Sequence, residues 1–433
     1  MQLGSAVGKG VYGKVYSLEK HKKLCVKTYT AEVDSCFVEL AILVKVSHPN
    51  IVDVRGVARH KAGWMLVMKR EDTNLEKIIE ASQLKKSDVG HVALSLTRAL
   101  HYLKGIGVLH KDPKPANVLM TGGQPRLCDF GLSQMAHHPY DAPAYTAGYD
   151  APEMEKAGAV ASFQTELWAL GAIVLSMMTG TIYNTRTDVL MFCCEDMDFD
   201  AKLVDMTIKM LDSDPARRVD VETVLEGLSG VVPPVVPPLK QVYPKTGLAM
   251  GKYFAGVVLQ GYKQLHEDKF YLTRPFFLAA QLFRMHLGGV SDPPKQCLYT
   301  MFVVCYAIAA SFMGVHDYES YLEKTSNKRT FKQYTNTLLT ASIDWLCHKT
   351  PYEHLLELLG KEALTDVEEE ILLWGMAFHG CPAQRAVTIA TFVAEMLLPT
   401  ETKALQRAVF RDFTTRYGPI GVTPTVAALA ALS

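Results

Sequence analysis

Short stretches in which apolar and polar residues alternate dominate the first eighty residues or so, and helical periodicity dominates after them. Alternation is typical of strands with one buried face, and it occurs in Ile51–Ala58 and Trp64–Met68. One apolar stretch of helical period, Phe37–Leu43, interrupts these strand-like segments. The pattern predicts a sheet with a single helix, followed by a mainly helical region.

A proline-rich segment divides the chain. It reads Ser-Gly-Val-Val-Pro-Pro-Val-Val-Pro-Pro-Leu over Ser229–Leu239. Because proline lacks a backbone N–H and fixes φ, this segment suits neither a helix interior nor a central strand, and we expect a stiff polyproline-II spacer. We therefore predict a first domain over residues 1–229 and a linker over 230–250.

Beyond the linker the strand signal almost disappears. Thr350 and Glu353 form the signature of a capping box with proline at the first helical position, and Thr365 with Glu368 forms another box. The second region is therefore predicted to be all helical. Its apolar stretches of helical period are residues 253–266, 273–287, 293–313, 331–347 and 351–360.

The composition is that of an ordinary globular protein. Lysine plus arginine and aspartate plus glutamate each number 45, so nothing favours a nucleic acid or an acidic membrane as partner. The nine cysteines include no C-x-x-C pair, which is typical of buried thiols in a reducing compartment. The first residues show no secretory signal. We expect a monomeric, intracellular protein, cytoplasmic or nuclear.

One uncharged stretch, Cys297–Val315, is nineteen residues long and by length alone suits a membrane span. It contains Cys, Tyr, Thr, Ser and Gly rather than a run of Leu, Ile and Val, and segments of similar polarity flank it. A buried central helix is therefore the favoured interpretation, and no membrane contact is expected.

A glycine-rich segment is the first candidate for chemistry. Gly8, Gly10 and Gly13 follow the spacing G-x-G-x-x-G, which lets backbone N–H groups approach a polyphosphate. Alone this pattern is weak, because it also occurs at dinucleotide sites. The short strand-like segment that follows ends in Lys27, which favours a phosphoryl-transfer site.

Further polar motifs follow in a fixed order. Each alone is more often structural than catalytic, but the whole ordered set has no structural explanation. The motifs are Glu39 in the predicted helix, His48-Pro-Asn, His110-Lys-Asp112-Pro-Lys114-Pro-Ala-Asn117, Asp129-Phe-Gly131 and Ala151-Pro-Glu153. With these motifs, the first 225 residues or so resemble the protein kinases.

The resemblance implies an α+β bilobal protein kinase fold, with an N-lobe over residues 1–70 and a C-lobe over 71–229. It also implies ATP and Mg²⁺ as cofactors and the serine or threonine hydroxyl of a protein as substrate. Such a reaction depends on positioning and charge neutralisation more than on covalent catalysis.

The residues that match the kinase motifs take the family's roles. Lys27 would hold the α/β-phosphates, and Glu39 would hold Lys27. Asn117 and Asp129 would bind Mg²⁺, which prefers a few hard oxygen ligands.

Two further matches lie in the predicted catalytic loop. Asp112 would accept the proton of the substrate hydroxyl, and Lys114 would neutralise the γ-phosphate. These roles, like the previous ones, are implied by the resemblance.

The same resemblance implies a nucleotide pocket. Met68 would be the gatekeeper, backbone groups of Lys69 and Glu71 would face adenine, and Cys25 would lie against its ring. The implied ATP-binding positions are Gly8, Lys9, Gly10, Val11, Gly13, Val15, Cys25, Lys27, Met68, Lys69, Glu71 and Asn74.

Among kinases, the glycine loop with Tyr12 looks most like that of the cyclin-dependent kinases. In that family three arginines grip a phosphothreonine of the activation loop; Val38, Lys111 and Gln134 stand at those positions here. A bidentate guanidinium is not replaced by one lysine, so we predict activity without activation-loop phosphorylation. The phosphothreonine position falls near Asp141.

Other matches are structural or concern substrate recognition. Glu166 stands for the aspartate of the family's D-x-W-S-x-G motif, and Arg218 is expected to pair with Glu153. The sequence from Thr146 looks like that of generic protein kinases. Asp150 replaces an arginine that supports proline-directed recognition in the cyclin-dependent family.

The helical region resembles a cyclin box over residues 251–362, with a partial second box over 363–433. Leu298–Ser311 looks like the central buried helix of that box. Phe312 and Thr337 replace a charged pair that helps cyclins contact their kinases. A generic helical bundle is the alternative interpretation.

Three functions compete on these grounds. The first is an active kinase that carries its own cyclin-like activator, packed on its N-lobe against the helix of Glu39. The second is a pseudokinase scaffold. The third is an active kinase whose helical domain docks another protein.

Overall fold

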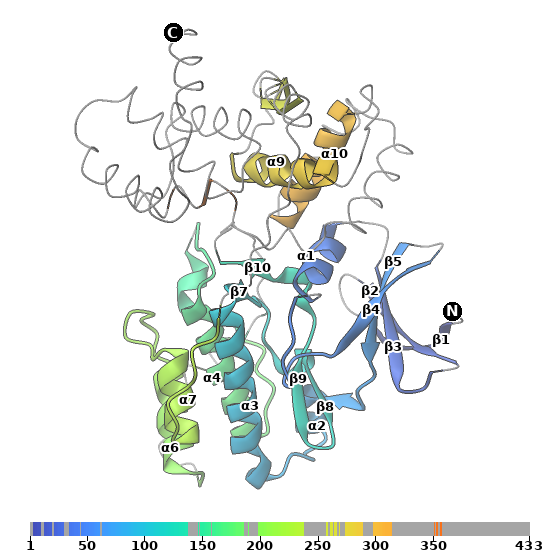
Figure 1. Ribbon diagram of the computed structural model, residues 1–433. Coiled ribbons are helices and arrows are strands. Elements are labelled where there is room, and N and C mark those ends of the chain that lie inside the picture. Colours follow the sequence, from blue (N-terminus) through green and yellow to red (C-terminus); the bar gives the residue numbers. More distant parts are fainter. Residues whose placement is uncertain are drawn as a thin grey trace, which may run out of the picture. The chain divides into compact units, whose positions relative to one another are not determined.

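The computed structural model describes most of the predicted kinase domain and two long helices of the second region (Figure 1). The chain divides into two compact units, Met1–Leu239 with Phe312–Gly314 and the remainder, and each is described by itself. The described residues are 3–9, 13–19, 21–29, 34–43, 45–60, 63–136, 146, 148–156, 158–185, 189, 198–237, 257–258, 260–262, 264–265, 268, 273–288, 298–313, 350, 352–353 and 356.

Five antiparallel strands form the sheet of the N-lobe in the order β1-β2-β3-β5-β4. The buried face of this sheet is built from Leu18, Val26, Met65 and Val67, which alternate with residues on the opposite face. The strands are β1 (Leu3–Lys9), β2 (Gly13–Leu18), β3 (Leu24–Tyr29), β4 (Val54–His60) and β5 (Gly63–Lys69).

A single helix accompanies this sheet, as the sequence predicted. Helix α1 (Asp34–Leu43) packs against η2 (Phe130–Leu132), a short 3₁₀ turn of the C-lobe. The residues from Leu40 to Leu43 are all buried. This packing brings the helix that carries Glu39 next to the Asp129-Phe-Gly131 motif.

The C-lobe is mainly helical. Helix α3 packs against α4 and α7, and α4 also packs against α6, around the fully buried Trp168 (Figure 1). The helices are α2 (Leu75–Glu80), α3 (Lys86–Gly105), α4 (Phe163–Thr179), α6 (Ala201–Met210) and α7 (Val221–Ser229), with a 3₁₀ turn η3 (Pro152–Glu155).

Short strands, one before α2 and the others between α3 and α4, position the candidate chemistry. Strands β6, β8 and β9 form one sheet, and β7 pairs with β10 in another. The catalytic-loop motif lies between β7 and β8, and Asp129 follows β9. These elements are β6 (Thr73–Asn74), β7 (Val108–Leu109), η1 (Pro115–Asn117), β8 (Val118–Thr121), β9 (Gln124–Leu127) and β10 (Gln134–Met135).

The proline-rich segment begins where α7 ends, and its residues 231–237 form neither helix nor strand. Pro233 and Val236, three residues apart, are half-buried, as expected of a helix with three residues per turn. Val235 is 93% exposed. The Val236 side chain lies so close to Gly105 that a Cβ there would come within 2.2 Å of it. The start of the spacer therefore packs on the end of α3.

The second unit contributes α9 (Thr273–Gly288) and α10 (Leu298–Phe312). Phe302 of α10 lies edge-on to Phe276 and Phe283 of α9, with ring centroids 5.5 and 5.7 Å apart. Every side chain from Met301 to Ala310 is buried, so α10 is the buried helix that the sequence predicted. Among the described residues, no helix combines the length and apolar character that crossing a bilayer requires.

The predicted capping box is confirmed. The backbone N–H and hydroxyl of Thr350 donate to the Glu353 carboxylate, and the N–H of Glu353 donates back to the hydroxyl. The helices expected over residues 331–347 and 363–433 lie outside the described residues, as do Gly10, Val11, Tyr12, Asp141 and Thr337.

Candidate active site

A buried lysine bridges two carboxylates at the junction of the lobes. Lys27 of β3 places its Nζ 2.6 Å from Glu39 Oε2 of α1 and 2.7 Å from Asp129 Oδ1. The hydroxyl of Tyr29 also donates to Glu39 Oε2, at 3.0 Å. Tyr29 follows Lys27 by two residues and therefore lies on the same face of the strand.

Within this cluster the charges of Lys27 and Asp129 support each other. Burial alone would lower the pKa of Lys27, but the carboxylates of Glu39 and Asp129 outweigh it, so the pKa is raised above its usual value. Burial would raise the pKa of Asp129, but Lys27 outweighs it and the pKa is lowered. The cluster therefore keeps a fixed cation beside an ionised carboxylate.

A buried glutamate holds the catalytic-loop backbone. Glu166 of α4 accepts the N–H of His110 through Oε2 at 3.1 Å and the N–H of Lys111 through Oε1 at 2.8 Å. Burial raises the pKa of Glu166 to about 7, against the effect of these two donors. Lys111 has a positive φ of 69°, so the bonds fix an uncommon backbone turn.

The loop presents Asp112 within a network of polar groups. The Asn117 amide donates to the backbone oxygen and to Oδ2 of Asp112, at 2.9 and 2.8 Å. Lys114 Nζ lies 2.8 Å from Asp112 Oδ2 and donates to the Thr146 hydroxyl at 2.9 Å. That hydroxyl donates to Asp112 Oδ1 at 2.5 Å. Asp112 and Lys114 together therefore hold a hydroxyl group.

The donor set beside this network fits a hard divalent cation. Both N–H groups of the Asn117 amide serve Asp112, so its carbonyl oxygen is the atom left for a ligand. Asp129 uses Oδ1 for Lys27 and has a second carboxylate oxygen. Within the described part of the chain, no group of three or more His, Cys, Asp or Glu side chains could hold a metal ion. The oxygens of Asn117 and Asp129 suit Mg²⁺, which takes few protein ligands and completes its shell with phosphates and water.

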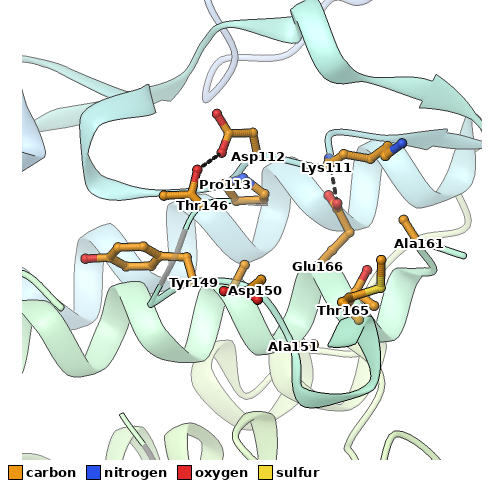
Figure 2. A pocket seen from close by; sticks show the side chains of 12 residues that line it. Lys111, Asp112, Pro113, Thr146, Tyr149, Asp150, Ala151, Ala161, Thr165 and Glu166 are labelled. Atoms are coloured by element: carbon orange, nitrogen blue, oxygen red, sulfur yellow. Dashed lines mark hydrogen bonds between the residues drawn. The ribbon is translucent and has the colours of Figure 1, made fainter. Parts of the chain in front are cut away.

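A pocket opens beside Asp112 (Figure 2). It is bounded by the catalytic loop, by the segment from Thr146 to Ala151 and by α4. Two carboxyl groups, those of Asp150 and Glu166, line it with Asp112. Pro113, which is buried, supplies an apolar wall. The remaining lining residues are Lys111, Thr146, Tyr149, Ala151, Met154, Ala161, Thr165 and Ala169.

A bidentate ion pair joins η3 to the segment before α7. The Arg218 guanidinium lies 2.7 and 3.0 Å from the two oxygens of Glu153 and stacks over Trp168, with 5.3 Å to the ring centroid. It also donates to the backbone oxygen of Gln164 at 2.7 Å. These are the two residues that the sequence paired.

Some of the residues predicted to bind ATP are described. Gly8 pairs with Val15 across β1 and β2, and Val15 in turn lies opposite Lys27. A Cβ on Gly13 would come within 2.3 Å of the Thr28 oxygen, so this glycine is sterically required. The side chain of Lys9 lies outside the described residues.

Two more residues predicted to bind ATP lie on β3 and β5. Cys25 pairs with Met68, and both are buried. Burial raises the pKa of Cys25 to about 11, so the thiol is neutral. Asn74, predicted to bind ATP, caps α2: its Oδ1 accepts the Lys77 N–H at 3.0 Å and its Nδ2 donates to Ala116 at 3.3 Å. Its role toward the nucleotide stays a prediction.

The positions that hold a phosphothreonine in cyclin-dependent kinases have other contacts here. Lys111 Nζ donates to the side-chain oxygen of Gln134 at 3.1 Å. Val38 lies in α1, and its side chain is outside the described residues.

Sequence reasoning missed two polar contacts. One is Tyr29 with Glu39, which the period of two along β3 could have indicated. The other is an ion pair in which Arg126 Nη1 lies 3.1 and 3.0 Å from the two carboxylate oxygens of Glu71. These residues are 55 apart, and no motif links them.

Comparisons with known proteins decide the family. Residues 1–227 match the protein kinase domain. The chain belongs to the protein kinase family. A probable cell division protein kinase of Encephalitozoon cuniculi is 30% identical over 189 residues, covering 41% of this chain and 71% of that protein.

Other relatives represent several kinase groups. Human calcium/calmodulin-dependent protein kinase type IV is 26% identical over 246 residues, covering 50% of this kinase and 51% of its own length. Cyclin-dependent kinase F-4 of Oryza sativa subsp. japonica is 28% identical over 185 residues, covering 40% of each chain. The match to the kinase domain ends at residue 227 and does not extend into the helical unit.

Proposed function

We propose that this kinase transfers the γ-phosphoryl group of ATP, with Mg²⁺, to serine or threonine hydroxyls of proteins, and that its helical unit regulates it in cis. The observation that carries the proposal is Lys27, held between Glu39 and Asp129 at 2.6 and 2.7 Å. Phosphoryl transfer requires charges placed in advance rather than covalent chemistry. A pseudokinase would have no need of this fully paired arrangement.

The residues then divide the work. Lys27 binds the α/β-phosphates, and Asn117 and Asp129 hold Mg²⁺, which neutralises phosphate charge when bound. Asp112 orients the substrate hydroxyl and accepts its proton as the oxygen attacks the γ-phosphorus. The bond to the β,γ-bridging oxygen breaks, and ADP leaves. Lys114 balances the negative charge beside Asp112.

The decisive experiment measures phosphate transfer from ATP to a panel of serine- and threonine-containing proteins. The full-length chain is expected to be active, Asp129→Asn inactive, and Asp112→Asn slower by orders of magnitude. Asp205→Asn, at an exposed surface pair, is the matched control and should keep full activity. If the wild type and Asp129→Asn are equally inactive with Mg²⁺-ATP, the chain is a pseudokinase.

The proposal includes activity without activation-loop phosphorylation. Lys111 donates to the neutral Gln134 at 3.1 Å, so this site offers no arginine fork for a phosphate. Enzyme treated with phosphatase is expected to keep its rate. A large loss of rate, restored by an upstream kinase, would contradict this part of the proposal.

Regulation in cis follows from the cyclin-like pattern of the helical unit. A cyclin-like domain acts by holding the helix of Glu39 against Lys27, so removal of the unit should slow the enzyme. Residues 1–239 alone are expected to be far less active than the full chain, and residues 245–433 added in trans should restore the rate at high concentration. If the fragment is as active as the full chain, the helical unit is a docking module for another protein.

A further inference from the structure

The segment 69–72 joins β5 to β6 and is called the hinge here. The side chain of Glu71, in its middle, is only 1% exposed, although the residue as a whole is half-buried. The exposed part of Glu71 is therefore its backbone. This arrangement is unusual for a glutamate in a connecting segment, where the carboxylate normally turns to water.

The carboxylate is buried because Arg126 of β9 satisfies it. The guanidinium Nη1 lies 3.1 and 3.0 Å from the two oxygens of Glu71, and Lys69 Nζ lies 3.9 Å from Oε1. A buried carboxylate without such a partner is strongly unfavourable. The pair therefore fixes the direction in which the Glu71 side chain leaves the hinge, and with it the orientation of the peptide group.

The backbone N–H groups of the hinge differ in their hydrogen bonds. The N–H of Lys69 donates to Asp53 and that of Arg70 to Lys23, both at 2.9 Å. The N–H of Asp72 donates to the Thr121 hydroxyl, also at 2.9 Å. Within the described part of the protein, the N–H of Glu71 has no acceptor among these hydrogen bonds. The residue with the anchored side chain is thus the one whose amide is left for a ligand.

We propose that Arg126 is a positioning residue for the nucleotide: it clamps Glu71 to β9 and so holds the Glu71 peptide group toward the adenine base. This inference rests on the proposed ATP site, because the hinge lies beside Cys25 and Met68 on its adenine side. Arg126 acts on the affinity for the base and not on the transfer step.

The test is a kinetic and binding comparison on the full-length chain. Arg126→Met keeps an unbranched apolar stem and removes the guanidinium, so it is expected to raise KM for ATP about tenfold with kcat within twofold. Arg126→Lys should recover part of the affinity through a single contact. GTP shares the phosphates but not the hydrogen-bonding edge of adenine, so KM for GTP should not change, and the preference for ATP should fall.

Two measurements separate positioning from loss of structure. Arg217→Met removes an exposed arginine that lies 3.1 Å from a carboxylate and should leave both KM values unchanged. Calorimetric titration with ADP should show the same weakening for Arg126→Met without any turnover. If Arg126→Met does not fold, Arg126→Lys and Glu71→Gln provide the same comparison.

The inference is overturned if Arg126→Met leaves KM for ATP unchanged, if it weakens ATP and GTP equally, or if it lowers kcat as much as it raises KM. Failure of the proposed function looks different. In that case the wild type transfers no phosphate, while ADP titration still reports whether Arg126 supports base binding.

Discussion

Two lysines near the catalytic loop have opposite surroundings. Lys27 lies between two carboxylates, with Nζ 2.6 and 2.7 Å from Glu39 and Asp129. Lys111 donates to the neutral amide of Gln134 at 3.1 Å, where cyclin-dependent kinases have arginines for a phosphothreonine. In the first site a cation lies between two carboxylates, and in the second a cation donates to a neutral amide.

The difference separates charged groups that depend on one another from positions at which the arginines have been replaced. The charges of the first cluster depend on one another, because removal of Lys27 would leave the Glu39 and Asp129 carboxylates without their shared cation. In this chain the first cluster keeps its cation and both carboxylates, whereas Val38, Lys111 and Gln134 stand at the positions of the three arginines.

Lys27→Met should have the largest effect on the rate of protein phosphorylation. It leaves Glu39 and Asp129 facing each other without a cation and removes the charge that would bind the phosphates. We expect the rate of protein phosphorylation to fall by roughly 10²–10³-fold. Steady-state assays measure this, and Lys209→Met, in an exposed pair with Asp205, should keep its rate. A loss below tenfold would mean that Lys27 is not part of the machinery.

Glu166 should give the kinase unit a characteristic pH dependence. Its pKa is raised from 4.5 to about 7, so between these values the folded state binds more protons than the unfolded state. Stability from this group is therefore complete below pH 4.5 and is lost as pH rises through 7, by about 3 kcal/mol.

Glu166→Gln cannot titrate and isolates this contribution. Urea unfolding of both proteins at pH 5 and pH 8 should show wild-type stability falling relative to the variant as pH rises. A difference that is constant, or that grows in favour of the wild type, would contradict the assigned protonation.

Tyr29→Phe tests the edge of the Lys27 cluster. It removes the 3.0 Å hydrogen bond to Glu39 but leaves the ion pair with Lys27 in place. One such bond contributes about 1 kcal/mol, so kcat/KM for ATP should fall about fivefold. A fall as large as that of Lys27→Met would show that Tyr29 has a role of its own in the reaction.

Gln134→Leu should have the smallest effect. Among the described residues the buried Nε2 of Gln134 has no hydrogen-bond partner, so an apolar side chain of similar size costs little there. The rate should stay within about twofold and remain insensitive to phosphatase. A tenfold loss would show that the Lys111–Gln134 bond replaces the missing arginine cluster in function.

Sequence reasoning succeeded where chemistry imposes residue type and spacing together. Glu39 was expected to hold Lys27 because phosphoryl transfer needs a positioned cation, and the structure places Glu39 Oε2 2.6 Å from Lys27 Nζ. Arg126 could not be found in this way. The ion pair between Arg126 and Glu71 depends on how strand β9 packs beside the hinge, and neither residue belongs to a motif.

The helical unit shows the other limit. Apolar periodicity predicted helices over 273–287 and 293–313, close to the observed Thr273–Gly288 and Leu298–Phe312. It could not specify how Phe302 packs between Phe276 and Phe283, because apolar side chains of similar volume are largely interchangeable in a core. The topology that would distinguish a cyclin box from another bundle is not encoded in the period.

The contact between Val236 and Gly105 ties the linker to a position in α3. A side chain at 105 would collide with Val236, since even a Cβ would come within 2.2 Å of it. The two positions should therefore change together in descendants of this sequence: a larger residue at 105 should accompany a smaller residue at 236 or a shifted linker. The sequence of the linker is thus constrained by its packing on the kinase unit. A recombination that replaced everything after Ser229 would remove the Val236 side chain that packs on the end of α3. A kinase unit transferred to another protein should therefore include the start of the linker as well as α7.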